Sequence, residues 1–176
     1  MNSMMRLTKA EYGCYLALAA RSRSEDPHTQ VGTALFDKEW RTVSTGFNGF
    51  ASGVDPDDSV FEDRNRKSEL INHAEINAIL FSSRQPYYAC MVYSPCIHCA
   101  KTIAASKIKH IYFLKQYKKS NSETADLKYT DIFTFNSIKY EQLDKSSLSK
   151  ILYWIEKDKE FIKNLYETNN FISTNC

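Results

Sequence analysis

The segment 89–116, "ACMVYSPCIHCAKTIAASKIKHIYFLKQ", reads as a short apolar strand, a helix and a second strand. Pro95 ends the first strand and is tolerated in the first helical turn, where its missing N–H removes no hydrogen bond. Cys96 and Cys99 lie three residues apart at the start of the helix, so both sulfur atoms project from one face. The positive end of the helix dipole favours the thiolate, which is the form that binds metal. The segment therefore predicts a strand–helix–strand unit that presents two metal-binding sulfurs.

Upstream of this segment, the pattern predicts a helix, a hairpin and a second helix. Thr8 and Glu11 have capping-box spacing at the start of the first helix. Two strand-like segments joined by a short turn near 37–39 indicate an antiparallel hairpin. The polar segment that follows is long enough to be a functional loop. The predicted bounds are helix 8–23, strands 30–37 and 40–48, loop 49–66, and a helix led by His73 with Ile76, Ile79 and Leu80 on its buried face.

Downstream, the pattern predicts a helix over 123–136, a weak strand over 137–143, an amphipathic helix over 146–167 and a frayed tail. About twenty residues that include a helix separate the last two strands, which allows a parallel crossover. We therefore expect an α/β fold with three α-β-α layers around a five-stranded mixed sheet. At 176 residues the chain is expected to be a single domain (1–176), with a core over about 7–143 and a C-terminal helical extension over about 147–168.

His73 and Glu75, in "NHAEINAIL" at 72–80, supply what the two cysteines lack. Two thiolates need at least one more ligand to hold zinc, and His73, also at a helix start, is the natural third. Three protein ligands leave one tetrahedral position for water, which is typical of a catalytic site. Glu75 is placed to act as a general base and proton shuttle. Without these partners, C-x-x-C could equally be a redox pair or two core thiols, and a capped, solvated helix start would explain the His and Glu.

An H-x-E upstream of P-C-x-x-C is the signature of the zinc nucleobase deaminases. In that chemistry a zinc-bound hydroxide attacks C4 of cytosine, and the glutamate protonates the ring nitrogen and then the departing amine. His98 lies between the two cysteines at a different angle around the helix. We interpret it as a solvent-facing or structural histidine and not as a ligand.

Composition narrows the function classes further. A formal net charge of +2 and the absence of an extended basic stripe argue against a nucleic-acid partner. No apolar run approaches the roughly 20 residues that span a bilayer, so no membrane partner is expected. The N-terminus lacks an apolar signal core, and the five cysteines are an odd number. These features predict reduced thiols and a cytoplasmic protein, in the host cytoplasm if it is phage-encoded.

Beyond the zinc motif, the blocks "ARSRSEDPHTQVGTALFD", "TGFNG", "HAEINAIL" and "SPCIHCAKTIAASKIKHIYF" resemble those of deoxycytidylate (dCMP) deaminases, in the same order. The similarity covers about residues 7–143 and is greatest to phage-encoded members. It implies the cytidine deaminase-like fold and conversion of dCMP to dUMP and ammonia, which supplies thymidylate synthesis. It also implies one catalytic Zn²⁺ per subunit, held by His73, Cys96 and Cys99, with Glu75 as the proton shuttle.

The resemblance assigns further residues to the nucleotide. Asn48 contacts the deoxyribose and base region, and the Ala74 backbone reads the pyrimidine edge. Ser22 and Arg23 approach the 5′-phosphate through charge-assisted hydrogen bonds, and Tyr117 places an aromatic ring at the substrate. From the residues alone, Asn48 would be a turn residue, Ser22 and Arg23 a solvated helix end, and Tyr117 a surface aromatic.

The resemblance also implies regulation and assembly. It places activating dCTP and inhibiting dTTP near Gly49, Phe50 and Gly53, with Mg²⁺ accompanying the nucleotide effector, in a homo-oligomer for which a hexamer is favoured. Some phage members carry a second, structural zinc in the region that corresponds to 49–72. That stretch contains neither Cys nor His here, so we predict no second zinc there.

Other functions remain open on the residues alone. The enzymatic alternatives are a bifunctional dCMP/dCTP deaminase or a deaminase of another cytosine compound or nucleoside. The alternative from a different class is a structural zinc module for protein interaction. A structural zinc site usually closes with a fourth Cys or His, so the glutamate beside the three ligands argues against that alternative.

Overall fold

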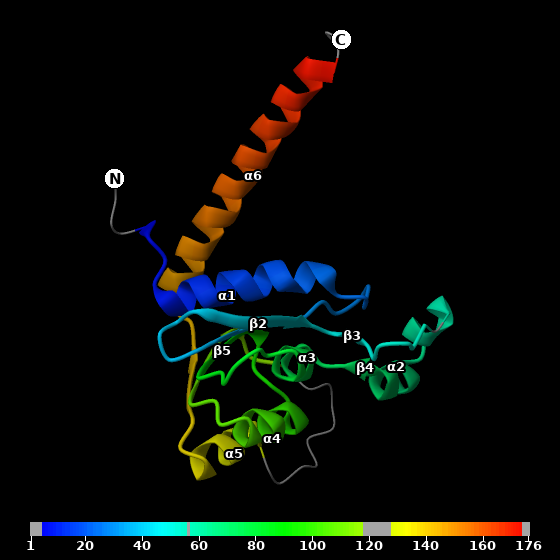
Figure 1. Ribbon diagram of the computed structural model, residues 1–176, viewed down its shortest axis with the longest axis vertical. Coiled ribbons are helices and arrows are strands. Elements are labelled where there is room, and N and C mark those ends of the chain that lie inside the picture. The colour runs from blue at the N-terminus through cyan, green and yellow to red at the C-terminus, as the bar shows by residue number, and fades with distance from the viewer. Residues whose placement is uncertain (1–4, 56, 118–127, 174–176) are drawn as a thin grey trace.

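The computed structural model describes residues 5–55, 57–117 and 128–173, without the side chains of 169–173. The central sheet has five strands in the order β2-β1-β5-β6-β7 (Figure 1). Strand β1 is antiparallel to both β2 and β5, whereas β5, β6 and β7 are parallel to one another, as predicted for the last two strands. The strands are β1 (Gly32–Phe36), β2 (Thr42–Phe47), β5 (Tyr88–Tyr93), β6 (His110–Lys115) and β7 (Lys139–Gln142).

Helices cover both faces of this sheet, which confirms the three-layer α-β-α prediction (Figure 1). Strand β5 is buried on both sides: Ala89 and Met91 face one core, and Cys90 and Val92 face the other. This alternation follows from the two-residue period of a strand. The first core includes α3 (Ala74–Leu80), α4 (Ile97–Ala105) and α5 (Tyr129–Phe135); the second includes α1 (Lys9–Ala20) and the start of α6 (Lys145–Ser173).

The first helix begins as its sequence predicts. Thr8 caps it, and Glu11 accepts a hydrogen bond from the Thr8 backbone N–H at 2.7 Å, which completes the capping box. The helix ends at Ala20, and the last predicted turn is a short 3-10 helix, Arg21–Arg23. Glu11 also accepts a hydrogen bond from the Lys150 ammonium at 3.0 Å, and this ion pair joins α1 to α6.

Three predictions about local structure were wrong. The expected loop 49–66 contains the strand β3 (Gly49–Phe50), a 3-10 helix (Asp58–Phe61) and the beginning of α2 (Arg64–Leu70), and β3 pairs with β4 (Ile71–Asn72). Leu80 is 67% exposed, because Ala74, Glu75 and Ala78 form the buried side of α3. The expected frayed tail continues α6 as far as Ser173. Of the predicted helix 123–136, residues 123–127 lie outside the described part of the chain.

Gly46 sets how closely β2 approaches α3, the helix that carries Glu75. A Cβ atom at this position would lie 2.3 Å from the Ala74 carbonyl oxygen and 2.4 Å from the Ala78 nitrogen. Gly46→Ala is therefore expected to lower the free energy of unfolding by about 1–3 kcal/mol, as overpacking usually does. It should also reduce activity by displacing α3. Denaturant titrations of both variants check the expected change in stability. For Thr45→Ala, at the neighbouring exposed position of β2, the free energy of unfolding should stay within about 0.5 kcal/mol of the wild-type value. Equal stability of the two variants would contradict the close-contact explanation.

Candidate functional site

Three potential metal ligands meet where α3 and α4 begin. His73 is the N-cap residue of α3, Cys96 is the N-cap of α4, and Cys99 lies in the first turn of α4. The His73 Nδ1 atom is 3.2 Å from the Cys99 sulfur and 3.5 Å from the Cys96 sulfur. Tetrahedral zinc with bonds of about 2.0–2.3 Å to nitrogen and sulfur separates its ligand atoms by about 3.5 Å. The three side chains thus fit zinc as a ligand set, and they leave a fourth position for a small molecule.

The electrostatics of this cluster favour a charged sulfur. The pKa of Cys96 is lowered to about 3, first by its hydrogen bond with the Cys99 thiol and then by that with His73. The backbone N–H of Cys99 also donates to the Cys96 sulfur, at 3.5 Å. The hydrogen bond between the two cysteine side chains raises the pKa of Cys99, because one proton is shared between the two adjacent sulfur atoms. The hydrogen bond with Cys96 raises the pKa of His73. A site that stabilises a thiolate before any cation binds is suited to a metal.

Glu75 is buried next to the cluster. It lies in the first turn of α3, and only 6% of its surface is exposed. Burial is the largest of the effects that raise the pKa of its carboxyl group, because it penalises the charged form. A carboxyl group whose pKa is moved toward neutrality can both accept and donate a proton, as general acid–base catalysis requires. His98, between the two cysteines, is exposed and does not belong to the cluster.

A cavity of about 560 Å³ opens above the cluster, with Glu75 in its lining. Of the residues predicted to contact a nucleotide, Asn48, Ala74 and Tyr117 line it. Tyr117 is held by a hydrogen bond from its backbone N–H to the Ser94 hydroxyl at 2.9 Å, and its ring is 6.4 Å from that of Tyr93. The other lining residues are Asp26, His28, Thr29, Val31, Phe61, Arg64, Lys67, Ser68, Ile71, His73, Tyr93, Ser94 and Cys96.

Asn48 anchors one wall of this cavity. Its side-chain oxygen accepts hydrogen bonds from the Ser24 hydroxyl and the Val31 N–H, both at 2.7 Å. Its side-chain nitrogen donates to the Thr29 carbonyl at 2.8 Å. The amide therefore fixes the segment between α1 and β1 against the end of β2, which goes beyond the role of a simple turn residue.

The remaining predicted contact residues lie outside the cavity lining. The Ser22 hydroxyl donates to the Ala19 carbonyl at 2.8 Å, and the Arg23 guanidinium lies 5.9 Å from the centre of the Phe47 ring. Phosphate binding by Ser22 and Arg23 stays a prediction.

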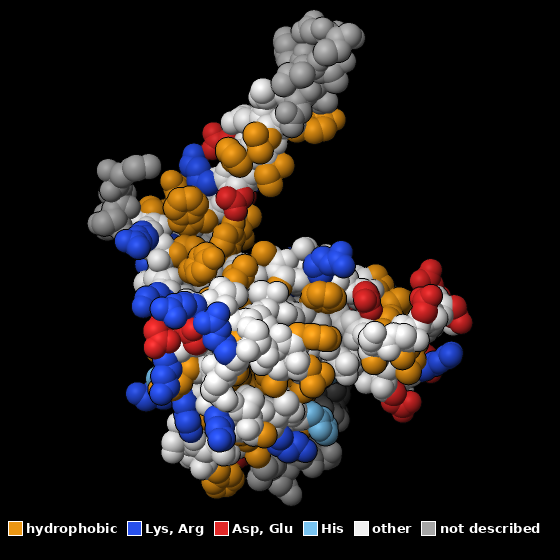
Figure 2. Space-filling model, viewed as in Figure 1, with side chains coloured by type: hydrophobic (Ala, Val, Ile, Leu, Met, Phe, Trp, Pro, Cys, Tyr) orange, Lys and Arg blue, Asp and Glu red, His pale blue; other side chains and the backbone are white. Residues whose placement is uncertain are grey.

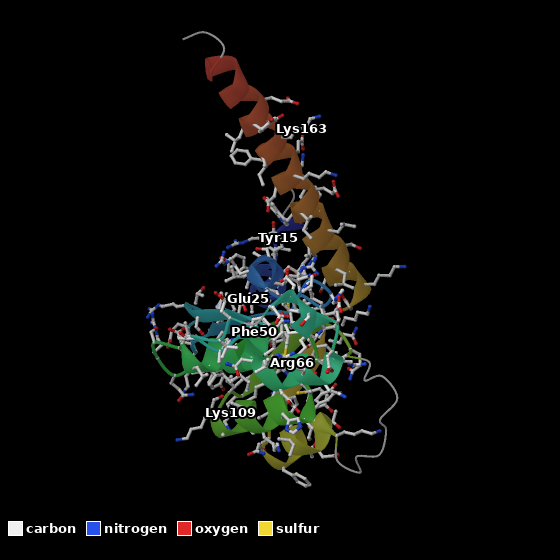
Figure 3. The ribbon with its side chains drawn as sticks, turned by 90° about the vertical axis from the view of Figure 1, so that its right-hand side faces the viewer. Tyr15, Glu25, Phe50, Arg66, Lys109 and Lys163 are labelled. Atoms are coloured by element: carbon white, nitrogen blue, oxygen red, sulfur yellow. The ribbon has the colours of Figure 1, made fainter. Side chains whose placement is uncertain are left out.

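The residues predicted to contact an effector lie nearby but also outside the lining. The backbone N–H of Phe50, in β3 beside Gly49, donates to the Glu25 carboxylate at 2.7 Å; Figure 3 labels Glu25 and Phe50. Gly53, three residues after the end of β3, has a φ of +85°, a conformation that favours glycine. The effector role of these three residues also stays a prediction.

Sequence reasoning missed the cavity wall formed by α2, which includes Arg64 and Lys67. A signal for this helix was present. Asp63 is its N-cap residue and accepts hydrogen bonds from the backbone N–H groups of Asn65 and Arg66, at 2.9 and 3.2 Å. An aspartate followed by good helix formers predicts a helix start, but the length, the polarity and the glycines of the segment 49–66 favoured a loop.

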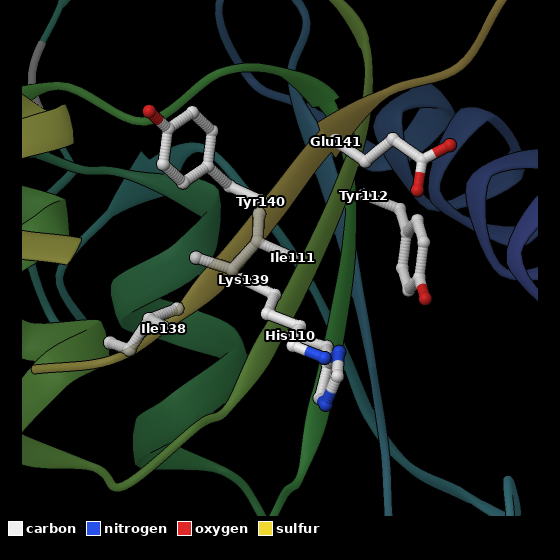
Figure 4. Close-up of a pocket in the computed structure, with 7 residues that line it drawn as sticks. All are labelled: His110, Ile111, Tyr112, Ile138, Lys139, Tyr140 and Glu141. Atoms are coloured by element: carbon white, nitrogen blue, oxygen red, sulfur yellow. The ribbon is translucent and has the colours of Figure 1, made fainter. Parts of the chain in front are cut away.

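A second hollow, of about 580 Å³, runs along β6 and the edge strand β7 (Figure 4). It is lined by His110, Ile111, Tyr112, Ile138, Lys139, Tyr140 and Glu141. Figure 4 shows the Tyr112 and Tyr140 rings pointing away from each other on either side of the strands. The hollow contains no part of the His73–Cys96–Cys99 cluster.

Residues 7–115 match the family model of the cytidine and deoxycytidylate deaminase zinc-binding region. A probable deoxycytidylate deaminase of Caenorhabditis elegans is 39% identical over 108 residues, which cover 57% of this chain and 54% of that protein. Human deoxycytidylate deaminase is 33% identical over 125 residues, covering 65% of this chain and 70% of that protein. The chain thus spans about half of the nematode relative.

Among solved structures, the apo dCMP deaminase of the cyanophage S-TIM5 has the same fold. Its TM-score is 0.61 at 20% identity, and the alignment covers 81% of this chain and all of that one. No helix in the described part of this chain is both long and apolar enough to cross a membrane.

Proposed function

Because the chain belongs to the cytidine and deoxycytidylate deaminase family, we propose that it hydrolyses dCMP to dUMP and ammonia. This reaction supplies dUMP for thymidylate synthesis. The observation that carries the proposal is a buried glutamate beside a His-Cys-Cys cluster at a cavity large enough for a nucleotide. The names of the nematode and human relatives support dCMP as the substrate.

Zinc, when held by His73, Cys96 and Cys99, supplies a water molecule whose pKa is lowered toward about 7. The protein's own contribution to proton transfer is Glu75. Its carboxylate would accept a proton from the attacking water and deliver it to the N3 atom of cytosine. It would then carry the remaining proton of the new C4 hydroxyl group to the 4-amino group. The C4–O bond forms, the C4–N bond breaks, and ammonia leaves, so the reaction consumes one water and involves no redox change. Burial raises the pKa of Glu75, which makes its carboxyl group a better proton acceptor than an exposed one.

The nucleotide is held by the cavity walls. The Ala74 backbone reads the pyrimidine edge, Asn48 shapes the deoxyribose side, and Tyr117 lies at the substrate. Asn48 does so while its amide remains bonded to the segment between α1 and β1. Ser22 and Arg23, which the family resemblance assigns to the 5′-phosphate, lie outside the cavity lining.

The proposal extends to regulation and assembly. Activating dCTP and inhibiting dTTP, with Mg²⁺, would bind near Gly49, Phe50 and Gly53 in a homo-oligomer, with a hexamer favoured. The cytoplasm is the proposed compartment. Regulation and assembly rest on the family resemblance, whereas the compartment rests on the N-terminal sequence and the odd number of cysteines.

The decisive experiment measures ammonia release from dCMP, dCTP, CMP and deoxycytidine by the zinc-loaded protein, with and without dCTP and dTTP as effectors. We expect dCMP to be the preferred substrate. Turnover of dCTP comparable to that of dCMP would establish the bifunctional dCMP/dCTP deaminase. A preference for deoxycytidine would show that the protein is a nucleoside deaminase. A zinc-containing protein that releases no ammonia from any of the four would point to a structural zinc module.

A further inference from the structure

The wall of the cavity formed by α2 carries two cations. Arg64 and Lys67 are three residues apart on this helix and both line the cavity that contains Glu75. Residues at this spacing lie on the same side of a helix. In Figure 1, α2 lies beyond β4 as seen from α3, at the outer end of the domain. The cations therefore stand on a different wall from the sulfur atoms, which α4 supplies.

Their environments differ. The Lys67 ammonium forms an ion pair with the Asp26 carboxylate at 2.8 Å, and the two side chains are only 16% and 4% exposed. Asp26 is itself fixed by the backbone N–H groups of His28 and Thr29, at 2.9 and 3.1 Å. Lys67 is thus held in place and largely neutralised. Arg64 is exposed and forms no ion pair with any carboxylate in the described part of the chain.

An unneutralised guanidinium at a cavity wall is suited to a phosphate, because its planar N–H groups can bind two oxygen atoms at once. We propose that Arg64, on the helix that the Lys67–Asp26 ion pair anchors, binds the 5′-phosphate and makes the enzyme selective for a nucleoside monophosphate. This inference rests on the proposed deaminase function. It assigns the phosphate to a residue within the cavity, whereas Arg23 lies outside its lining.

The test compares kcat/KM for dCMP and deoxycytidine, which differ only in the phosphate. Arg64→Gln should lose about 10- to 100-fold on dCMP, the usual effect of removing a charged hydrogen bond, with little change on deoxycytidine. Arg66→Gln is the matched control on the same helix, since the exposed Arg66 (Figure 3) does not line the cavity, and it should keep the wild-type ratio.

Arg23→Gln is measured alongside. Equal losses on both substrates for Arg64→Gln, or a selective loss in Arg23→Gln alone, would overturn the assignment to Arg64. Wild-type protein that deaminates neither compound would refute the proposed function, a result distinct from either of these.

A separate observation concerns α6, which projects away from the rest of the molecule (Figure 1). Its first half packs on the N-terminal region: Lys150 pairs with Glu11, the Trp154 indole donates to the Met5 carbonyl at 2.8 Å, and Asp158 accepts a hydrogen bond from the Tyr15 hydroxyl. Beyond Asp158 the helix continues to Ser173.

One side of this helix carries an exposed apolar surface, which we call the α6 patch: Ile155, Phe161, Ile162, Leu165 and Tyr166, between 39% and 69% exposed. Figure 2 shows hydrophobic side chains along the projecting helix. Five large side chains exposed to this extent amount to roughly several hundred Å², comparable to the largest patches on monomers, which are often interaction sites.

The spacing and the charges indicate what covers this patch. Ile155 and Ile162 are seven residues apart, and Leu165 follows at the next three-residue step, as in helices that pair with one another. The flanking charges alternate in sign and pair within the helix, Lys157 with Glu160 and Lys163 with Glu167. Such flanks do not select an acidic or a basic partner, but they match an identical helix. Each copy of the chain carries the same patch, so a two-fold arrangement buries both at once.

We infer that the α6 patch binds the α6 patch of a second copy of this chain. This contact is independent of the catalytic cavity, and α6 lies outside the family match at residues 7–115. Burying the patch removes apolar surface from water, at roughly 25 cal/mol per Å².

Sedimentation velocity at micromolar concentration tests this inference with two matched variants. Ile162→Lys places a charge in the patch, whereas Asn164→Lys adds the same charge at an exposed position on the other side of the helix. We expect the wild type and Asn164→Lys to form the same assembly, and Ile162→Lys to have a lower mass with deaminase activity retained as the check on folding. A monomeric wild type, or an unchanged mass in Ile162→Lys, would overturn the inference; a membrane or an unrelated protein would then be the partner to seek.

Discussion

Replacing Glu75 by Gln is expected to reduce kcat for dCMP by at least 10²- to 10⁴-fold, the range attributed to a positioned general acid–base. The amide is close in size to the carboxylate but can neither accept the proton from water nor return it to the ring. The zinc content should not change, because Glu75 is not a member of the ligand cluster. Activity and zinc content measured on one preparation, by ammonia release and elemental analysis, therefore separate proton transfer from metal binding.

The pKa of Glu75 gives this variant a second readout. Burial raises the pKa of the carboxyl group in the folded protein, so the charged form is disfavoured there relative to the unfolded chain. A raised carboxyl pKa costs stability above the unfolded pKa, and Gln removes that cost at neutral pH. The metal-free variant should thus be at least as stable as the metal-free wild type. Glu39→Gln, the same change at an exposed position of the β1–β2 turn, should keep full activity. Substantial activity in Glu75→Gln would show that another group carries the proton.

Replacing Cys99 by Ala is expected to reduce bound zinc by at least tenfold and to abolish deamination. Cys99 is 1% exposed, and its sulfur lies 3.2 Å from the His73 Nδ1 atom, so no other side chain can take its place without moving α4. Two remaining ligands bind zinc much more weakly than three. Because metal binding stabilises only the folded state, the melting temperature should also fall, and added zinc should not restore it.

Cys90→Ala provides the matched control for this variant. Cys90 is also fully buried, but it lies in the core between β5 and α1. Removing its sulfur should cost some stability through lost packing while leaving the zinc content unchanged. Equal zinc loss in both variants would attribute the effect to general unfolding, and full zinc content in Cys99→Ala would remove Cys99 from the ligand set.

Much of the fold could be predicted from the sequence because its signals are local. The capping box at Thr8 and Glu11, the short turn that joins β1 and β2 into a hairpin, and the apolar strand that ends before Pro95 each depend on neighbouring residues, and the structure has all three. The H-x-E and C-x-x-C spacings are equally local. They place His73, Cys96 and Cys99 at helix starts, and the family model of a zinc-binding deaminase region agrees with that chemistry.

Leu80 and α2 show where local signals failed. The three- and four-residue spacing around α3 identifies an apolar face, but the sheet packs on the narrow Ala74–Ala78 side because Gly46 allows a close approach there. Leu80 is left exposed as a result. The helix α2 is short, so the helix propensity of its residues is too weak to hold it by itself. Contacts with the rest of the domain, such as the Lys67–Asp26 ion pair, stabilise it.

The sequence by itself determined the α/β scaffold and the short spacings that bring a His-Cys-Cys group and a glutamate to helix starts, because such spacings depend only on the local geometry of helices and strands. Only the tertiary structure decided which side chains surround the cavity. Asn48 is bonded to three residues from 24–31, Arg64 and Lys67 line the wall, and Arg23 is left outside. A cavity is bounded by segments far apart in the chain, and which of their side chains face it depends on packing that no local pattern encodes.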